Sequence, residues 1–568
     1  MIVSSFFLTS LLLSFGYVSQ GRPGTIVFWS LTIAIVLSLL TEMHSSPLPS
    51  SKSFQILVLV QVVYLCLTLN SLYQWRGMGN VPGYDTQLDM GATFITRDFV
   101  WPTAVHSTYV SQFRSVYCYP ILHILALAVS EIDGASLVSS ALFLPSMIVS
   151  FTVLGLYAFA RTFTHDARVA LQSSLTFVFV MGVVSCDFVR QTAGIFFLVL
   201  SLWMATCVLT RKNAGKMSVS FLFVAVAFGL SHSFSAFAGI ILLFSLALLF
   251  FLLKRHPLSG KFSYYPEATR VVAVLAMALL LVLVWLLLVV RLDISPLSTV
   301  LQYFLVASQE GFAKSGSSSI PWDVYASYLG NGILLLVANI GAFCALRKIG
   351  STLAAAVTLL GCGWSFALVG GIFLLNRGGE VPISLVRALL FSWVVMIPVS
   401  LYSFRILLQR KGRAVRLLLP FFFVLTFAVL GILYIPTYIY DQRATPDYSS
   451  GDVDLFLTPE DFALATSFTL NGSIVGDQGM QELLAGYWGS DVKVSLAAFQ
   501  GDTSVLRQYD WLVVRAEDFR IVWDRSAPRG SPLSEVLGHM PKEFFVYLAE
   551  TTPYDVVYDS GSLWVFAV

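Results

Sequence analysis

Residues 136–160 read SLVSSALFLPSMIVSFTVLGLYAFA, a stretch that contains no Asp, Glu, Lys or Arg. An α-helix needs about 20 predominantly apolar residues to cross the hydrocarbon core of a bilayer. Similar stretches recur along most of the chain and predict a polytopic α-helical membrane protein with about thirteen transmembrane helices. The other predicted spans are 1–20, 24–41, 54–72, 168–186, 191–210, 217–233, 235–253, 270–290, 326–346, 351–375, 384–404 and 416–438.

The composition of the whole chain also indicates a membrane protein. Of its 568 residues, 57% are hydrophobic and 12% charged, against about 45–50% and 25% in a soluble domain. The mean hydropathy is +0.79. These values exclude a soluble enzyme, a disordered chain and a nucleic-acid-binding protein, and the net charge of +2 supports none of them. The six cysteines have no C-x-x-C pair and no His at ligand spacing, so they indicate neither a zinc site nor a dense disulfide framework.

The positions of Lys and Arg predict the orientation of the chain, because short cytoplasmic loops carry an excess of positive charge. These residues gather in alternate connections: Arg161 with Arg168, Arg211 with Lys212 and Lys216, Lys254 with Arg255 and Lys261, Arg347 with Lys348, and the run from Arg405 to Arg416. We therefore expect a multi-pass protein, most simply of the cell membrane, whose N-terminus lies in the cytoplasm. The loops 73–118 and 291–325 and the tail 439–568 then lie outside.

The tail 439–568 has lower hydropathy than the membrane part, residues 1–438, and alternates strand-like with helical runs. Its last residues read as two strands joined by an Asp559-Ser560-Gly561 turn, which predicts a β-hairpin. We expect a small α/β domain, since a chain of this length can bury a core of its own. A short apolar stretch at 121–129 predicts an interfacial or re-entrant helix rather than a full span.

The first external loop holds the strongest candidates for chemistry. Residues 83–98 read GYDTQLDMGATFITRD. If Asp85 begins a helix, Asp89 lies one turn further along the same face, and the helix dipole favours both carboxylates near that N-terminus. The alternative is structural, with Asp85 as an N-cap and Asp89 as a solvated helix residue.

Several arginines are placed where they could face the same external cavity. Arg387 follows Glu380 by about two helical turns, at a depth where its guanidinium needs an anion or a carboxylate partner. The alternatives are pairing with Glu380 or snorkelling to lipid headgroups. His232 lies in apolar sequence near the outer face, where a hydrogen-bonded packing role competes with a functional one. The other candidate arginines are Arg97, Arg114, Arg190, Arg291 and Arg377.

This arrangement resembles the GT-C fold glycosyltransferases, in particular mannosyltransferase-like members of prokaryotes, and the resemblance covers most of the chain. The matching features are a long first external loop with an Asp, several short motifs along the bundle, and an external C-terminal α/β domain. The motifs are Gly83-Tyr84-Asp85, Tyr119-Pro120-Ile121-Leu122-His123, Ile132-Asp133-Gly134, Tyr157-Ala158-Phe159-Ala160-Arg161 and Leu230-Ser231-His232. The Trp-Trp-Asp-Tyr-Gly signature of oligosaccharyltransferases and the Asp-Glu pair of protein O-mannosyltransferases are both missing from the sequence.

The resemblance implies inverting transfer of a sugar from a polyprenyl-phosphate-linked (dolichyl-type) donor to a glycan, lipid or protein acceptor on the outer or lumenal face. Such a reaction needs a carboxylate to take the proton of the acceptor, and Asp85 is our candidate, with Asp89 second. Cations would stabilise the leaving phosphate; our candidates for donor binding are Arg387, Arg190, Arg97 and His232. We expect no essential metal and no cofactor, because arginine forks can hold the phosphate alone.

Two other functions are consistent with the sequence. A transporter or flippase for lipid-linked or glycan substrates would use the buried charges as a pathway, but the internal repeats common in transporters are not found. A glycan polymerase or ligase would depend on Arg190-Gln191 and His232 instead of Asp85.

Overall fold

The computed structural model describes most of the apolar helices and parts of the tail. The described residues are 22–44, 51–74, 89–90, 93, 96, 121–180, 190–210, 215–255, 322–375, 381–409, 411, 415, 418–431, 464, 470, 472–477, 480, 492–493, 495–515, 522–523, 537–538, 540–550, 555–559 and 563–568.

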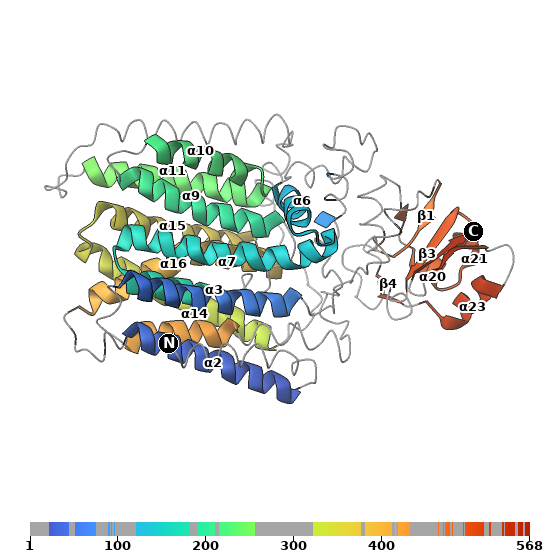
Figure 1. Ribbon diagram of the computed structural model, residues 1–568, viewed down its shortest axis with the longest axis horizontal. Helices are drawn as coiled ribbons and strands as arrows, with labels where there is room; N and C mark the ends of the chain where they lie inside the picture. The colour runs from blue at the N-terminus through green and yellow to red at the C-terminus, as the bar shows by residue number, and fades with distance from the viewer. Residues whose placement is uncertain are drawn as a thin grey trace.

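The described part of residues 1–438 is a bundle of helices that lie side by side (Figure 1). Most of the predicted spans coincide with these helices, whereas 1–20 and 270–290 lie outside the described residues. Five helices are long and apolar enough to cross a membrane among the residues described. The bundle helices are α2 (Arg22–His44), α3 (Lys52–Gln74), α7 (Leu137–Thr164), α8 (Ala167–Phe177), α9 (Arg190–Thr210), α10 (Gly215–Gly229), α11 (Ser233–Arg255), α14 (Trp322–Ala345), α15 (Thr352–Leu375) and α16 (Val381–Leu407), followed by an apolar helix over 418–431.

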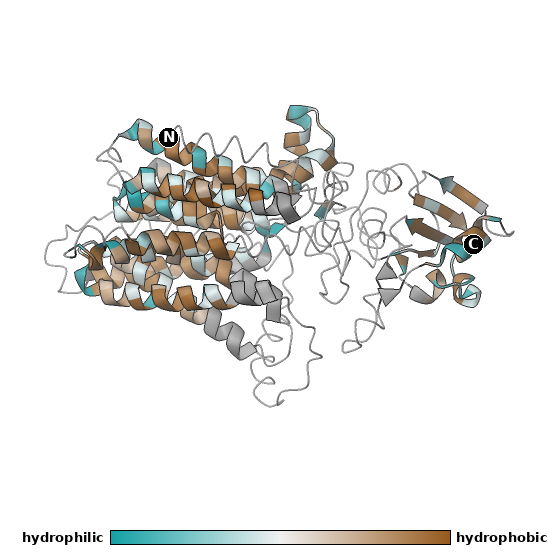
Figure 2. Cartoon of the chain, turned by 90° about the horizontal axis from the view of Figure 1, so that it is seen from below, coloured by the Kyte–Doolittle hydropathy of each residue, from teal (hydrophilic) through white to brown (hydrophobic). Residues whose placement is uncertain are grey.

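Hydrophobic residues predominate along the helices of the bundle (Figure 2). One large cluster of buried apolar side chains connects α2 and α3 with α7 to α11 and α14 to α16. Large apolar side chains also lie on the outer surface, with Phe223 73% exposed and Phe343 72% exposed. Apolar groups on every face of a helix are typical of a membrane span, because lipid tails cover the outer ones. The chain is therefore an integral membrane protein.

Local capping explains where α7 begins and ends and where α8 begins. Ser136 accepts a hydrogen bond from the Ser139 amide and starts α7, and His165, in the left-handed conformation, ends it. Asp166 then accepts from the amides of Arg168 and Val169 and starts α8. We predicted a full span over 168–186, but α8 ends at Phe177 and is too short to cross a bilayer.

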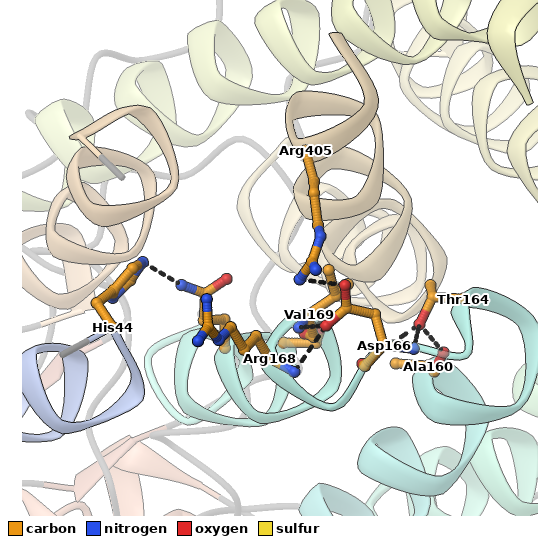
Figure 3. A network of polar contacts seen from close by, with 9 residues as sticks. His44, Ala160, Thr164, Asp166, Arg168, Val169 and Arg405 are labelled. Carbon is orange, nitrogen blue, oxygen red and sulfur yellow. Dashed lines mark hydrogen bonds and ion pairs between the residues drawn. The ribbon is translucent and has the colours of Figure 1, made fainter. Parts of the chain in front are cut away.

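A polar network ties three helices together at one end of the bundle (Figure 3). The Asp166 carboxylate at the start of α8 pairs with Arg405 near the end of α16. His44, the last residue of α2, lies 3.1 Å from the amide nitrogen of Gln172 in α8. Arg161, Arg168 and Arg405 therefore lie at the same end of the bundle, the end for which the sequence predicts a cytoplasmic location.

The helix α6 (Ile121–Asp133) and the tail lie at the opposite end (Figure 1). The Ile121 amide donates to the Leu230 carbonyl in the turn between α10 and α11, at 3.5 Å. A second cluster of buried apolar residues contains Leu122 of α6, Leu137 at the start of α7, and side chains of the tail such as Val513. Because α7 ends beside the Asp166–Arg405 pair, the tail and that pair lie at opposite ends of the bundle.

The tail contains a five-stranded mixed sheet. The strand order is β2 (Val492–Lys493), β1 (Ile474–Val475), β3 (Trp511–Arg515), β7 (Leu563–Ala567), β6 (Asp555–Asp559). The strands β1, β2 and β3 are parallel, whereas β7 is antiparallel to both β3 and β6. The predicted C-terminal β-hairpin is confirmed, and it forms one edge of the sheet. The strands β4 (Val522–Trp523) and β5 (Leu537–Gly538) form a separate pair.

The two faces of this sheet pack against different partners. Val475, Leu512 and Val514 lie in a cluster with residues of α20 (Leu496–Phe499), α21 (Thr503–Leu506) and α23 (Lys542–Glu550). Ile474 and Val513, which alternate with them along the strands, belong to the cluster that continues to α6 and α7. One face of the sheet is thus turned toward the helical bundle.

We expect the two ends of the bundle to lie on opposite sides of the membrane, with the tail outside, because the excess of positive charge in short cytoplasmic loops predicts a cytoplasmic location for the cationic end. Single cysteines placed at two exposed positions, Ser504 in the tail and Lys411 after α16, test this expectation. An impermeant thiol reagent applied to intact cells should label the first and not the second, with labelling of the parent chain as background. The reverse pattern would show that the orientation is inverted.

Candidate functional site

The Asp89 carboxylate lies at the centre of a buried polar cluster at the tail end of the bundle. Its Oδ1 atom is 2.8 Å from Nε of Arg190 and 3.0 Å from Nε2 of His123. Its Oδ2 atom accepts the Arg190 backbone amide at 3.2 Å. The side chains of Asp89 and His123 are each 1% exposed, and that of Arg190 is 15% exposed. We call these three residues the Asp89 cluster.

Three separate elements supply the Asp89 cluster. Asp89 lies in a helical piece of the first loop, where the Thr93 hydroxyl donates to the Asp89 carbonyl at 2.7 Å. His123 lies in the first turn of α6, and Arg190 is the first residue of α9. The Asp89 carboxylate therefore accepts from the N-terminus of α9, where the helix dipole favours a negative charge.

Apolar side chains that neighbour these residues in the chain are buried with them. Met90 and Leu122, the chain neighbours of Asp89 and His123, are fully buried, as is Ala193 in the first turn of α9. All three belong to the apolar cluster that continues into the tail sheet. The ion pair therefore lies in a medium of low polarity, where each of its contacts is stronger than in water.

Burial alone would raise the pKa of the Asp89 carboxyl. The Arg190 charge and the hydrogen bond from His123 outweigh this effect, so its pKa lies below the usual range of an aspartate. A carboxylate that is ionised, paired with an arginine and already in two hydrogen bonds is a poor acceptor for a further proton. Its geometry suits a group that fixes Arg190 and His123.

His232, just before α11, packs against α9 about one helical turn from Arg190 of the Asp89 cluster. Its Nδ1 atom is 2.9 Å from the Ser235 hydroxyl and accepts the Ser235 amide at 3.3 Å, at the start of α11. A Cβ added to Gly194 would lie 3.2 Å from Cβ of His232, so α9 and α11 are in close contact here. Gly194 is one turn from Arg190 on the same face of α9.

The predicted site residues are thus partly brought together. Asp89 and Arg190 are in contact, and His232 lies nearby with a hydrogen bond to Ser235, as its packing alternative predicts. Arg387 lies in the first turns of α16, but its side chain lies outside the described part of the structure. The other predicted residues, Asp85, Arg97, Arg114, Arg291 and Arg377, lie outside the described part of the chain.

The structure corrects one expectation and adds one residue. Asp89 is not a solvated helix residue, because the first turns of α6 and α9 enclose it. His123 was not among the predicted site residues, although it ends the Tyr119–His123 motif that carries the resemblance. The sequence did place an imidazole in the first turn of a short apolar helix, which could have indicated a site residue. Its partner Asp89 is 34 positions away, so no local pattern links the two residues. Among the residues that the structure describes, no three His, Cys, Asp or Glu side chains gather as a metal site.

Together these features define a polytopic bundle with a buried charged site at one end and a small α/β domain beyond it. This is the architecture expected for the GT-C-like class that the sequence resembles. No family model matches the chain, and no curated protein is found as a relative.

The chain is similar to several solved membrane-protein structures. ArnT from Cupriavidus metallidurans in the apo state has a TM-score of 0.47 at 13% identity, over 89% of this chain and 97% of that one. The oligosaccharyltransferase of Archaeoglobus fulgidus has a TM-score of 0.48 at 13% identity, over 82% and 70%. The mycobacterial arabinofuranosyltransferase AftD has a TM-score of 0.47 at 13% identity, over 89% of this chain and 40% of that one.

Proposed function

We propose that this protein is a membrane glycosyltransferase that transfers a sugar from a polyprenyl-phosphate-linked donor to a glycan, lipid or protein acceptor. The observation that supports this proposal most is the Asp89 cluster, a buried carboxylate that fixes an arginine at one end of an apolar bundle. A fixed cation at the membrane boundary is what a lipid-linked phosphate leaving group needs.

The helix α6 supports the location of the reaction at that boundary. Leu122, His123 and Ala126 are buried on its inner face, whereas Ile124 is 47% exposed and Ile132 86% exposed on the outer one. A short helix with one apolar face toward the surroundings suits the interface between headgroups and acyl chains. His123 and its partners would then lie at the depth of a lipid phosphate.

In the proposed mechanism Asp85 takes the proton of the acceptor hydroxyl while that oxygen attacks the anomeric carbon. The bond between this carbon and the phosphate oxygen breaks, and the polyprenyl phosphate leaves as an anion. Arg190, with Arg387 and Arg97, would stabilise this negative charge. Asp89 lies one helical turn from Asp85 in sequence, and it would hold the segment and Arg190 in place rather than act as the base.

Transfer by the purified protein tests the proposal. We would reconstitute the chain in lipid nanodiscs with radiolabelled sugars linked to polyprenyl phosphate and with an extract of membrane glycans as acceptor. One labelled donor should yield labelled product and free polyprenyl phosphate. If no donor in a panel of hexoses and pentoses reacts, while proteoliposomes carry one of them across the bilayer, the protein is a transporter instead.

The role of Arg387 can be tested by two substitutions. Arg387→Lys keeps the charge but removes the bidentate fork, and Arg387→Ala removes both. Both should weaken donor use, the Ala variant more strongly, as seen in a raised KM for the donor. A normal KM in the Ala variant would exclude the phosphate role and favour the headgroup alternative.

A further inference from the structure

His123 has one ring nitrogen with a partner and one without. Nε2 is 3.0 Å from Oδ1 of Asp89, whereas Nδ1 has no hydrogen-bond partner among the described residues. The residue is buried. A buried polar atom without a hydrogen bond is rare, because it loses its hydrogen bond to water on folding and gains none in return, which costs free energy.

The contact with Asp89 fixes which nitrogen carries the hydrogen. The lowered pKa of Asp89 keeps its carboxylate ionised, and an ionised carboxylate only accepts hydrogen bonds. Nε2 must therefore donate, and in the neutral ring Nδ1 then presents a lone pair. The Asp89 cluster thus holds a hydrogen-bond acceptor in a fixed orientation.

We propose that Nδ1 of His123 accepts a hydrogen bond from a hydroxyl group of the sugar substrate. This inference rests on the proposed function. A hydroxyl is the fitting ligand because it donates one hydrogen bond, carries no charge into the apolar surroundings of Met90 and Leu122, and is the most abundant group on a sugar. His123 would then select substrates by a hydroxyl at one position, while Asp85 acts as the base.

Deoxy analogues of the substrate test this role. The assay compares kcat/KM for the active donor and acceptor with kcat/KM for analogues that each lack one hydroxyl. In the native chain one analogue should be at least about tenfold poorer, because its binding leaves Nδ1 buried and unpaired. Separate series of deoxy donors and deoxy acceptors show which of the two sugars His123 contacts.

Two variants separate this hydrogen bond from a structural role. His123→Gln can donate to Asp89 and still offers an oxygen as acceptor, so discrimination against that analogue should persist. His123→Phe removes the acceptor, so the native and deoxy substrates should react within about twofold of each other. Size-exclusion profiles and thermal melting establish that each variant is folded, and His123→Leu replaces the Phe variant if the latter is not.

Spectroscopy on the native chain needs no substitution. In protein labelled with ¹⁵N-histidine, the Nδ1 signal of His123 is assigned as the one that disappears in the His123→Gln variant. The chemical shift of this signal should change when the substrate binds and stay unchanged when the deoxy analogue binds. If no analogue is discriminated through His123 and its signal does not move, Nδ1 is occupied by water and the inference is wrong. Transfer by the native chain would still support the proposed function, whereas an absence of transfer with every donor would contradict that function itself.

Discussion

Replacing Asp85 by Asn is expected to lower the turnover number about 10²- to 10⁴-fold, the usual contribution of a general base. The amide keeps the shape of the side chain but cannot take the proton of the acceptor. Donor binding should stay near that of the native chain, because the donor contacts cations in the proposed mechanism. Single-turnover transfer at saturating donor, with donor affinity measured separately, checks both expectations.

Asp133→Asn is the matched control for this experiment. Asp133 is an exposed carboxylate at the end of α6, near the same end of the bundle, and its Oδ1 accepts the Ala135 amide at 2.7 Å. Asn can make the same bond, so this variant should keep native turnover. If Asp85 were only a helix cap, Asn would replace it equally well. A folded and fully active Asp85→Asn variant would therefore contradict the proposed mechanism.

Hydropathy predicted most of the bundle because a membrane span is a local property of about 20 residues. It was wrong for α8, which ends at Phe177. Gln172 and Ser173 of this helix are buried, and Gln172 contacts His44 of α2. A short helix inside the bundle and a true span share an apolar sequence, and only their packing distinguishes them.

The tail shows the same difference between local and distant contacts. The C-terminal hairpin was predicted because its turn joins strands that are adjacent in sequence. The parallel pairing of β1 with β2 and β3 was not predicted, since it joins Ile474 to Val492 and to Trp511 across intervening segments.

The Asp89 cluster could be predicted only in part. The sequence identified Asp89 and Arg190 as separate candidates, but they are 101 positions apart and their pairing depends on the packing of α9 against the first loop. The local sequence around Asp89 is polar enough for a solvated helix. Its burial comes from α6 and α9, which no pattern within the loop reveals.

Asp89→Asn is expected to destabilise the cluster strongly. Removal of one partner from a buried ion pair typically costs about 3–5 kcal/mol, and the partial exposure of Arg190 favours the lower part of this range. Transfer should be lost together with the fixed position of Arg190. Hydrogen exchange of the amides in α6 and in the first turns of α9 should become faster, and the melting temperature should fall.

A double variant distinguishes loss of the pair from loss of a base. Adding Arg190→Gln to Asp89→Asn removes the uncompensated charge, so slow hydrogen exchange in α9 should return in part while activity stays low.

The stability of the native chain should also depend on pH in a defined direction. Because the pKa of Asp89 is lowered in the folded chain, its contribution to stability is complete above the unfolded value of about 3.9 and is lost as the pH falls through the folded value. The Asn variant should lack this acidic loss. One pair of results would instead make Asp89 the catalytic base. The Asp89→Asn protein would show native hydrogen exchange and a native melting temperature but no sugar transfer, and the Asp85→Asn protein would remain active.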